Sequence, residues 1–264
     1  MTAAIAPETD RLVWAVTNRV RAGHANGKVA VMQEMPGPAF GMFLTIAPFL
    51  DAGVDEDWVR RRYIYAPADD VSALLRFLVD RGYVTRSVDR LNVTTAFGPV
   101  LEGIESAIRE AAHFHWGEQP HLVDVALVPA RQVLEASTEP DVLVTAALAL
   151  PEADDKCQRL YERLAALRLL RNEAHVRAWR SHNLYPGEVE MLTAAWKESK
   201  LQAPPEPSEL LVEQGLVADG AVTDKGVALR RQIEAETNAA VEHAFSLIDR
   251  DEFLDILRSL PGAP

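Results

Sequence analysis

Residues 215–230 read GLVADGAVTDKGVALR, and this stretch decides the fold of the chain. Short apolar runs flank Asp219-Gly220, a dipeptide that strongly predicts the two-residue turn of a β-hairpin. From Asp224 the spacing of the apolar residues becomes helical and stays so to about Ile248. The stretch therefore predicts a tight hairpin followed directly by a long helix, a shape that is common in DNA-binding proteins.

The same order of elements occurs earlier in the chain, with a longer hairpin. Residues 76–104, RFLVDRGYVTRSVDRLNVTTAFGPVLEGI, align with residues 209–233, ELLVEQGLVADGAVTDKGVALRRQI. The alignment pairs Gly82 with Gly215, Thr95 with Thr223, Gly98 with Gly226, Leu101 with Leu229, and His115 with His243. This similarity predicts a tandem duplication, with repeats over residues 9–138 and 139–264 and a join near Pro140 or Pro151.

The rest of the chain has mostly helical periodicity. Start and stop signals predict helices over residues 10–24, 55–63, 66–82, 97–116, 157–183, 186–199, 224–248 and 250–260. Residues 39–53, AFGMFLTIAPFLDAG, are mostly apolar, so we expect them to be buried. The fold class is therefore mainly α: two winged helix-turn-helix repeats, each with a small β-hairpin wing, joined by long helices.

These segments resemble a known family. Residues 210–217 (LLVEQGLV), residues 222–238 (VTDKGVALRRQIEAETN) and the amphipathic helix that ends in LRSL are similar to the winged-helix fold of the MarR family of bacterial regulators. The likeness is good over Leu210–Leu260 and weaker over Phe77–His115. The whole chain also resembles an actinobacterial family of duplicated winged-helix proteins, and residues 170–179 (LRNEAHVRAW) are similar to a segment of that family.

The resemblance implies a ligand-responsive transcriptional regulator. MarR proteins act as homodimers that present two wings and two recognition helices to DNA. A duplicated chain would therefore be a monomer that mimics such a dimer, or would itself form a homodimer.

The charge of the chain argues against strong DNA binding. Its formal net charge is −12, whereas DNA-binding proteins normally carry a basic face. The predicted recognition helices carry Asp69 and Asp70 in the first copy, and Glu206, Glu209 and Glu213 in the second. Weak phosphate contacts are predicted at Arg60, Arg61, Arg62, Arg86 and Arg90. The alternative is that these arginines form a solvated face that balances nearby acids.

Residues 168–183, RLLRNEAHVRAWRSHN, combine residue types that are unusual for a core. Helical spacing places Arg168, Arg171, His175 and Trp179 on one stripe. Arginine can bind a carboxylate, histidine can move a proton near neutral pH, and tryptophan can pack against a planar ligand. We expect a ligand pocket at the seam between the repeats, with Arg168, Asn172, Trp179 and His182 as ligand-binding residues.

Two other interpretations of this stripe remain open. It could be a partly buried polar surface between the repeats, with Arg171 paired to a glutamate. It could also be the active site of an enzyme that acts on a small metabolite, with His175 as general acid or base and Arg171 as the anion clamp. Trp14, Met42, Phe43, Phe49 and Tyr63 could supply apolar walls from the first half.

Several classes of protein lack their signatures here. The sequence contains no P-loop, dinucleotide-binding, GxSxG, CxxC or HExxH motif, so we expect neither metal nor cofactor. The single cysteine, Cys157, stands at helical spacing between leucines and is predicted to be buried. No signal peptide and no 18-residue apolar span is visible, which predicts a cytoplasmic protein without a membrane partner.

Overall fold

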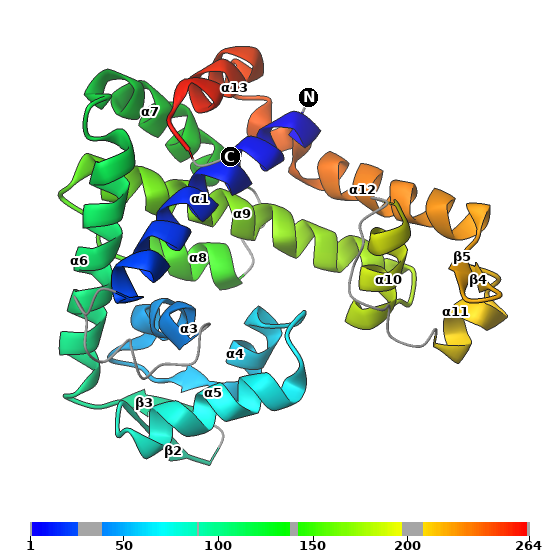
Figure 1. The fold of residues 1–264 in the computed structure, drawn as a ribbon, viewed down its shortest axis with the longest axis horizontal. Coiled ribbons are helices and arrows are strands. Elements are labelled where there is room, and N and C mark those ends of the chain that lie inside the picture. Colours follow the sequence, from blue (N-terminus) through cyan, green and yellow to red (C-terminus); the bar gives the residue numbers. More distant parts are fainter. Residues whose placement is uncertain (1, 26–38, 89, 138–141, 197–207, 263–264) are drawn as a thin grey trace.

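The computed structural model describes residues 2–25, 39–88, 90–137, 142–196 and 208–262. The described chain is mainly helical with two small antiparallel sheets, as predicted (Figure 1). The first half contains α1 (Thr2–Ala25), α3 (Ala39–Ile46), the 3-10 turn η1 (Ala47–Phe49), β1 (Val54–Asp55), α4 (Glu56–Arg62), α5 (Ala68–Asp80), β2 (Val84–Ser87), β3 (Arg90–Val93), α6 (Phe97–Trp116) and α7 (Pro120–Ala136). Next come α8 (Val142–Ala149), α9 (Lys156–Ser181), α10 (Pro186–Trp196), α11 (Glu209–Glu213), β4 (Val217–Ala218), β5 (Ala221–Val222), α12 (Asp224–Phe245) and α13 (Arg250–Ser259).

The long helix α9 lies at the centre of the molecule. It packs against α1, α7, α8 and α12, while α13 packs on both α1 and α7. These helices and α6 enclose the main apolar core, which extends into α3, α4, α5 and the first sheet. Within the described part of the chain, no helix is both long and apolar enough to cross a membrane.

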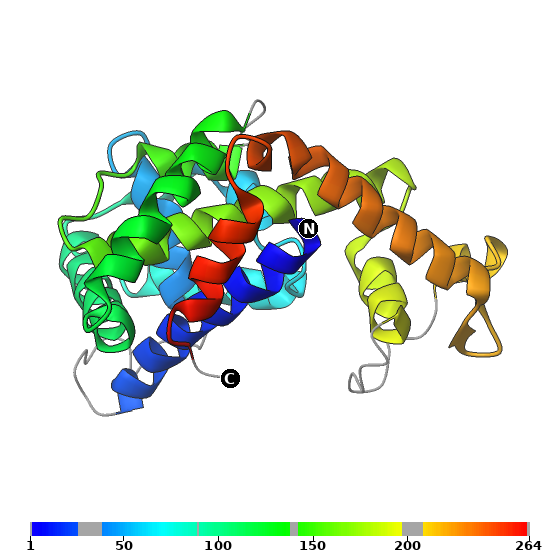
Figure 2. The same ribbon diagram turned by 90° about the horizontal axis from the view of Figure 1, so that it is seen from above.

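The outer ends of α9 and α12 carry a second, smaller unit. Figures 1 and 2 show α10, α11, β4 and β5 projecting from the rest of the molecule along these two helices. This unit has its own apolar cluster, centred on Trp179, Leu192, Leu211 and Ile233, apart from the main core. Burial of that cluster holds α10, α11 and the second hairpin against α9 and α12.

Both hairpins follow a helix that ends at a left-handed glycine. Gly82 after α5 has φ +71°, and Gly215 after α11 has φ +66°. The first hairpin is part of a three-stranded sheet in the order β1-β3-β2, and the second is the pair β4-β5. Asp219 and Gly220 both have positive φ, which is the turn geometry that Asp-Gly predicts.

The two hairpins close onto their helices with the same hydrogen bonds. The hydroxyl of Thr94 donates to the carbonyl of Gly82 at 2.6 Å, and the hydroxyl of Thr223 donates to that of Gly215 at 2.8 Å. In each case the next carbonyl in the chain also lies 3.2 Å from the threonine oxygen, so the two carbonyls share the single hydroxyl proton. Thr94, and not Thr95, is therefore the counterpart of Thr223, so the sequence alignment was wrong by one residue.

Burial along α6 and α12 agrees with the corrected register. In this register Gly226 aligns with Phe97 instead of Gly98, and Arg230 instead of Leu229 aligns with Leu101. Buried positions coincide along both helices: Phe97 with Gly226, Leu101 with Arg230, Ile104 with Ile233, Ile108 with Thr237, Ala112 with Val241, and Trp116 with Phe245. Of the two predicted joins, Pro151 lies between α8 and α9, whereas Pro140 lies outside the described residues.

Candidate functional site

A cavity of about 670 Å³ lies beside α9. Its walls come from α1, α3, α4, α6, α8 and α9, and from the C-terminal end of α12. Three residues of the predicted stripe line it, Arg168, Arg171 and His175, together with the predicted ligand-binding residue Asn172. A volume of this size is in the range of small-molecule sites.

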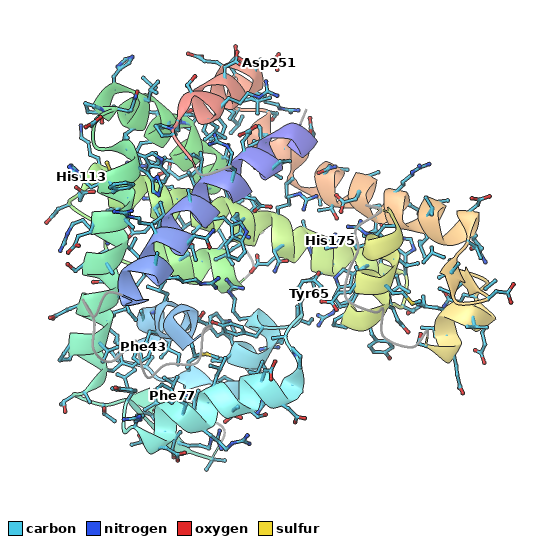
Figure 3. All side chains as sticks on the ribbon, in the orientation of Figure 1. Phe43, Tyr65, Phe77, His113, His175 and Asp251 are labelled. Carbon is cyan, nitrogen blue, oxygen red and sulfur yellow. The ribbon has the colours of Figure 1, made fainter. Side chains whose placement is uncertain are left out.

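The other two predicted ligand-binding residues do not line this cavity. Trp179 is buried, and its indole Nε1 donates a hydrogen bond to the hydroxyl of Tyr65 at 2.9 Å. Tyr65 does line the cavity, so Trp179 contacts the wall through this hydrogen bond. Figure 3 labels Tyr65 together with His175, which also lines the cavity. His182 lies beyond the stripe, with its Nε2 2.9 Å from a carboxylate oxygen of Glu236.

Arg171 forms an ion pair with a residue of α12. Its guanidinium lies 2.5 Å from Glu234, which is also 2.5 Å from the almost fully buried Arg230. Burial of Glu234 opposes its charge, but Arg171, Arg230 and His175 together lower its pKa below the usual value. One interpretation of the sequence paired Arg171 with a glutamate. In the structure that partner is Glu234.

His175 is oriented by the same helix. Its Nδ1 lies 3.1 Å from the hydroxyl of Thr237 and 4.0 Å from Glu234. The Thr237 hydroxyl already donates its only proton to the carbonyl of Ile233 at 2.7 Å, so it accepts from His175. The neutral ring then carries its proton on Nδ1 and a lone pair on Nε2, the form in which histidine can act as a base.

The five arginines predicted to contact phosphate have different partners. Arg60 and Arg86 both bind Glu56, at 2.7 and 2.9 Å. Arg90 donates to the carbonyl of Gly53 at 3.2 Å, and Arg61 is exposed.

Arg62 lies elsewhere, on the wall of the cavity, where sequence reasoning did not place it. It is the last residue of α4, and its guanidinium lies 5.7 Å from the ring centre of Tyr63. Burial lowers its pKa, and the positive charge of Arg168 adds to this, whereas Tyr63 and Glu173 act to raise it. Nothing in the sequence distinguishes Arg62 from Arg60 and Arg61, because only the orientation of α4 sends one of the three inward.

Aromatic side chains form much of the remaining wall. Trp14, Trp58, Tyr63, Tyr65 and Tyr161 line the cavity. Of the apolar residues predicted for a pocket, Trp14 and Tyr63 take part. Met42 and Phe43 are buried in the core instead, and Phe49 packs edge-on against Trp58 at 4.7 Å between ring centres.

Two carboxylates, Glu105 and Glu162, also line the cavity, and the sequence contained no signal for them. Burial raises the pKa of both, and a neighbouring glutamate adds to each shift. The cavity wall therefore carries acidic as well as basic side chains.

No metal site is found among the described residues, where no three His, Cys, Asp or Glu side chains come together. His113 and His115 stand at the end of α6, and the His113 ring is exposed to solvent near Asp155. Cys157 is buried as predicted, and burial raises the pKa of its thiol to about 11.

The surfaces that would face DNA are acidic. Asp69 and Asp70 are exposed in the first turn of α5, and Glu209 and Glu213 are exposed on α11. In a winged helix these helices would enter the major groove, where carboxylates repel phosphates.

Comparison with known proteins gives one match. A model described as a helix-turn-helix family matches residues 66–262, which is more than half of the chain. Searches of curated proteins and of solved structures find no match. Because the matched region runs from the start of α5 to the end of α13, the chain belongs to this helix-turn-helix family.

Proposed function

We propose that this protein is a small-molecule-binding winged-helix regulator of the MarR-like kind, with weak or lost DNA binding. The cavity beside α9 carries the proposal. It is walled by aromatic rings and by the Arg168–His175 stripe, and its wall includes Arg62 and Tyr65, which flank the turn leading into α5. A ligand there would contact both the central helix and the first helix-turn-helix.

Ligand binding is tested by a thermal-shift screen of a metabolite library. A ligand that binds only the folded state raises the melting temperature by mass action. Hits should lose their effect in Tyr65→Ala or Asn172→Ala and keep it in Val212→Ala, an exposed position on α11. If no compound stabilises the protein, the proposal fails.

Weak DNA binding is supported by the exposed acids of α5 and α11 and by the pairing of Arg60 and Arg86 with Glu56. Any duplex binding should fall steeply as salt rises, because phosphate contacts release counterions. Electrophoretic mobility shift over a salt series measures this, and Arg61→Ala with Arg90→Ala tests the two remaining arginines. Tight binding at physiological salt would contradict this part of the proposal.

We also propose that residues 9–138 and 139–264 are tandem winged-helix repeats that mimic a MarR dimer within one chain. The matching threonine–glycine hydrogen bonds and the matching burial of α6 and α12 support this arrangement. So does the exchange of partners, since α9 packs on α7 of the first half and α1 packs on α13 of the second. Light scattering after gel filtration should give the mass of a monomer, 29.1 kDa; a dimeric mass favours the homodimer.

The alternative is an enzyme at the same cavity. The observation that favours it is His175, which lines the cavity with Nδ1 held by Thr237. His175→Ala should then abolish turnover of a cavity ligand while leaving its binding and the fold intact. If every ligand found by the screen is recovered unchanged, the enzyme alternative is wrong.

A further inference from the structure

The turn between α4 and α5 sends neighbouring side chains into different parts of the molecule. Tyr63 packs against the main core, and its hydroxyl lies 3.4 Å from that of Thr45 in α3. Ile64 packs instead against the second apolar cluster, the one that contains Trp179. In the described chain the rest of that cluster lies between positions 176 and 233, so Ile64 is the residue through which the first half enters it.

Tyr65 adds a hydrogen bond to the same contact. The indole Nε1 of Trp179 donates to its hydroxyl at 2.9 Å, and the two rings meet edge to face with 6.4 Å between their centres. Trp179 is only 1% exposed, and a buried indole N–H normally has an acceptor. Tyr65 therefore supplies, from the first half, the acceptor that a core residue of the second unit needs.

Each of these two turn residues borders a cavity. Tyr65 lines the cavity of about 670 Å³, and Ile64 lines another of about 310 Å³ together with residues between Trp179 and Pro186. The second unit is attached more firmly elsewhere, because its apolar cluster packs on α9 and α12, which also pack along each other. A contact of one half-buried side chain and one hydrogen bond, bordered by cavities, can break while the helices that carry it stay folded.

We propose that Ile64 and Tyr65 form a latch that sets the spacing between α5 and the second unit, and that the second unit swings away with the outer ends of α9 and α12 when this latch opens. Helix α5 begins at Ala68, directly after the latch, whereas α11 belongs to the second unit. Opening therefore changes the distance between α5 and α11, the two helices predicted to face DNA. The latch acts in the free protein and does not depend on a ligand in the cavity.

The test compares two tyrosines of the same turn. Tyr65→Phe removes the hydroxyl that accepts from Trp179 and keeps the ring, so it weakens the latch without emptying the cavity wall. Tyr63→Phe is the matched control, because the partner of its hydroxyl, Thr45, lies in the first half. Loss of one hydrogen bond should raise the ratio of open to closed molecules about 2- to 10-fold in Tyr65→Phe. The control should leave this ratio unchanged.

The first readout is the distance between α5 and α11. Spin labels on Arg76→Cys and Val212→Cys, both at exposed positions, report it by double electron–electron resonance in a Cys157→Ala background. Wild type and Tyr63→Phe should share one main distance. Tyr65→Phe should add a longer one.

The second readout is hydroxyl-radical footprinting by mass spectrometry. Because Trp179 is buried while the latch is closed, its oxidation reports opening. Oxidation of Trp179 should rise about 2- to 10-fold in Tyr65→Phe and not in Tyr63→Phe. It should rise further when Ile64→Ala is added to Tyr65→Phe. Trp116, buried in the main core, is the internal reference and should stay protected throughout.

Two results would overturn the latch. If either the distance or the oxidation of Trp179 is unchanged in Tyr65→Phe, packing along α9 and α12 alone fixes the second unit. If Tyr63→Phe has the same effect as Tyr65→Phe, the change is a general loosening of the cavity wall. Neither result bears on small-molecule binding, which the metabolite screen tests separately.

Discussion

Glu234 forms an ion pair between the outer half of α9 and α12. Its carboxylate lies 2.5 Å from both Arg171 and Arg230, and the side chain of Arg230 is only 4% exposed. A buried ion pair adds little relative to an apolar pair, but losing one partner leaves an uncompensated charge. The stability of the network therefore depends on this single acid.

We expect Glu234→Gln to lower the free energy of unfolding by about 3 kcal/mol, because two arginines lose their carboxylate. Urea denaturation measures this. Glu236→Gln is the matched control on the same helix, since Glu236 is more exposed and pairs with His182 and Gln232. The control should change stability by less than about 0.5 kcal/mol. Equal effects of the two substitutions would show that Glu234 is not the central residue of the network.

The same network predicts a pH dependence. The folded-state pKa of Glu234 is lowered, so its stabilisation is fully present above the unfolded value of about 4.3 and is lost as pH falls through the lower folded value. The stability difference between wild type and Glu234→Gln should shrink below about pH 4. Urea titrations at each pH measure it, and a difference that grows on acidification would reverse the assigned sign.

Burial suppresses the ionisation of the Cys157 thiol, and with it the reactivity of the side chain. With a pKa of about 11, only about one thiol in a thousand is ionised at pH 8. Iodoacetamide should therefore leave the folded protein unmodified over hours and alkylate Cys157 rapidly in urea, as mass spectrometry would show. Rapid alkylation of the folded protein would mean that the N-terminal end of α9 opens readily.

At the scale of elements, the two hairpin-to-helix joints share hydrogen bonds but differ in packing. A Cβ atom on Gly226 would lie 2.4 Å from the carbonyl oxygen of Leu216 and 2.6 Å from Cγ1 of Val222. Gly98, which the sequence paired with it, has nothing within 4 Å of its Cβ position. The close contact between the second hairpin and α12 therefore requires a glycine at position 226, whereas Gly98 makes no such contact.

We expect Gly226→Ala to destabilise the second unit by about 1–3 kcal/mol, because the helix must move away from the hairpin. Gly98→Ala should be neutral or slightly stabilising, since alanine favours a helix and meets no neighbour. Thermal denaturation of both variants measures the difference. Equal stabilities would contradict the close contact between α12 and the second hairpin.

At the scale of the whole molecule, the described chain has two apolar clusters of unequal size. Helix α9 belongs to both: Leu160, Leu164 and Leu170 pack in the main core, whereas Ala178 and Trp179 pack in the smaller cluster. Local opening costs less where fewer apolar contacts must be broken. The second unit should therefore open without unfolding the rest.

Hydrogen exchange measured by mass spectrometry tests this. Amides of β4, β5 and the last two turns of α9 should exchange faster than those of α6 and the first turns of α9. A difference in amide exchange rate between the two ends of α9 is the decisive observation, because it distinguishes local opening from global unfolding. Uniform protection along α9 would mean that the two clusters unfold as one.

Much of the secondary structure follows from local signals. The helix over Phe97–Trp116 has the predicted bounds, Pro186 starts α10, and Asp219-Gly220 makes the predicted turn. Helix α9 is continuous from Lys156 to Ser181, close to the predicted range 157–183. These features depend on residues close together in the chain, so the sequence alone determined them.

The site could be predicted only in part. Periodicity placed Arg168, Arg171, Asn172 and His175 on neighbouring faces of α9, and all four line the cavity. It could not tell that Trp179, on the same stripe, meets Tyr65 instead.

Only the tertiary structure decided which distant residues the side chains on each helix face contact. Helical spacing gives the angle of a side chain about its own axis, but not which distant segment lies opposite. Arg62 turns inward because α4 packs beside the cavity, and Arg171 meets Glu234 because α12 packs along α9. Contacts between residues far apart in the sequence depend on the packing of whole helices, which no local pattern records.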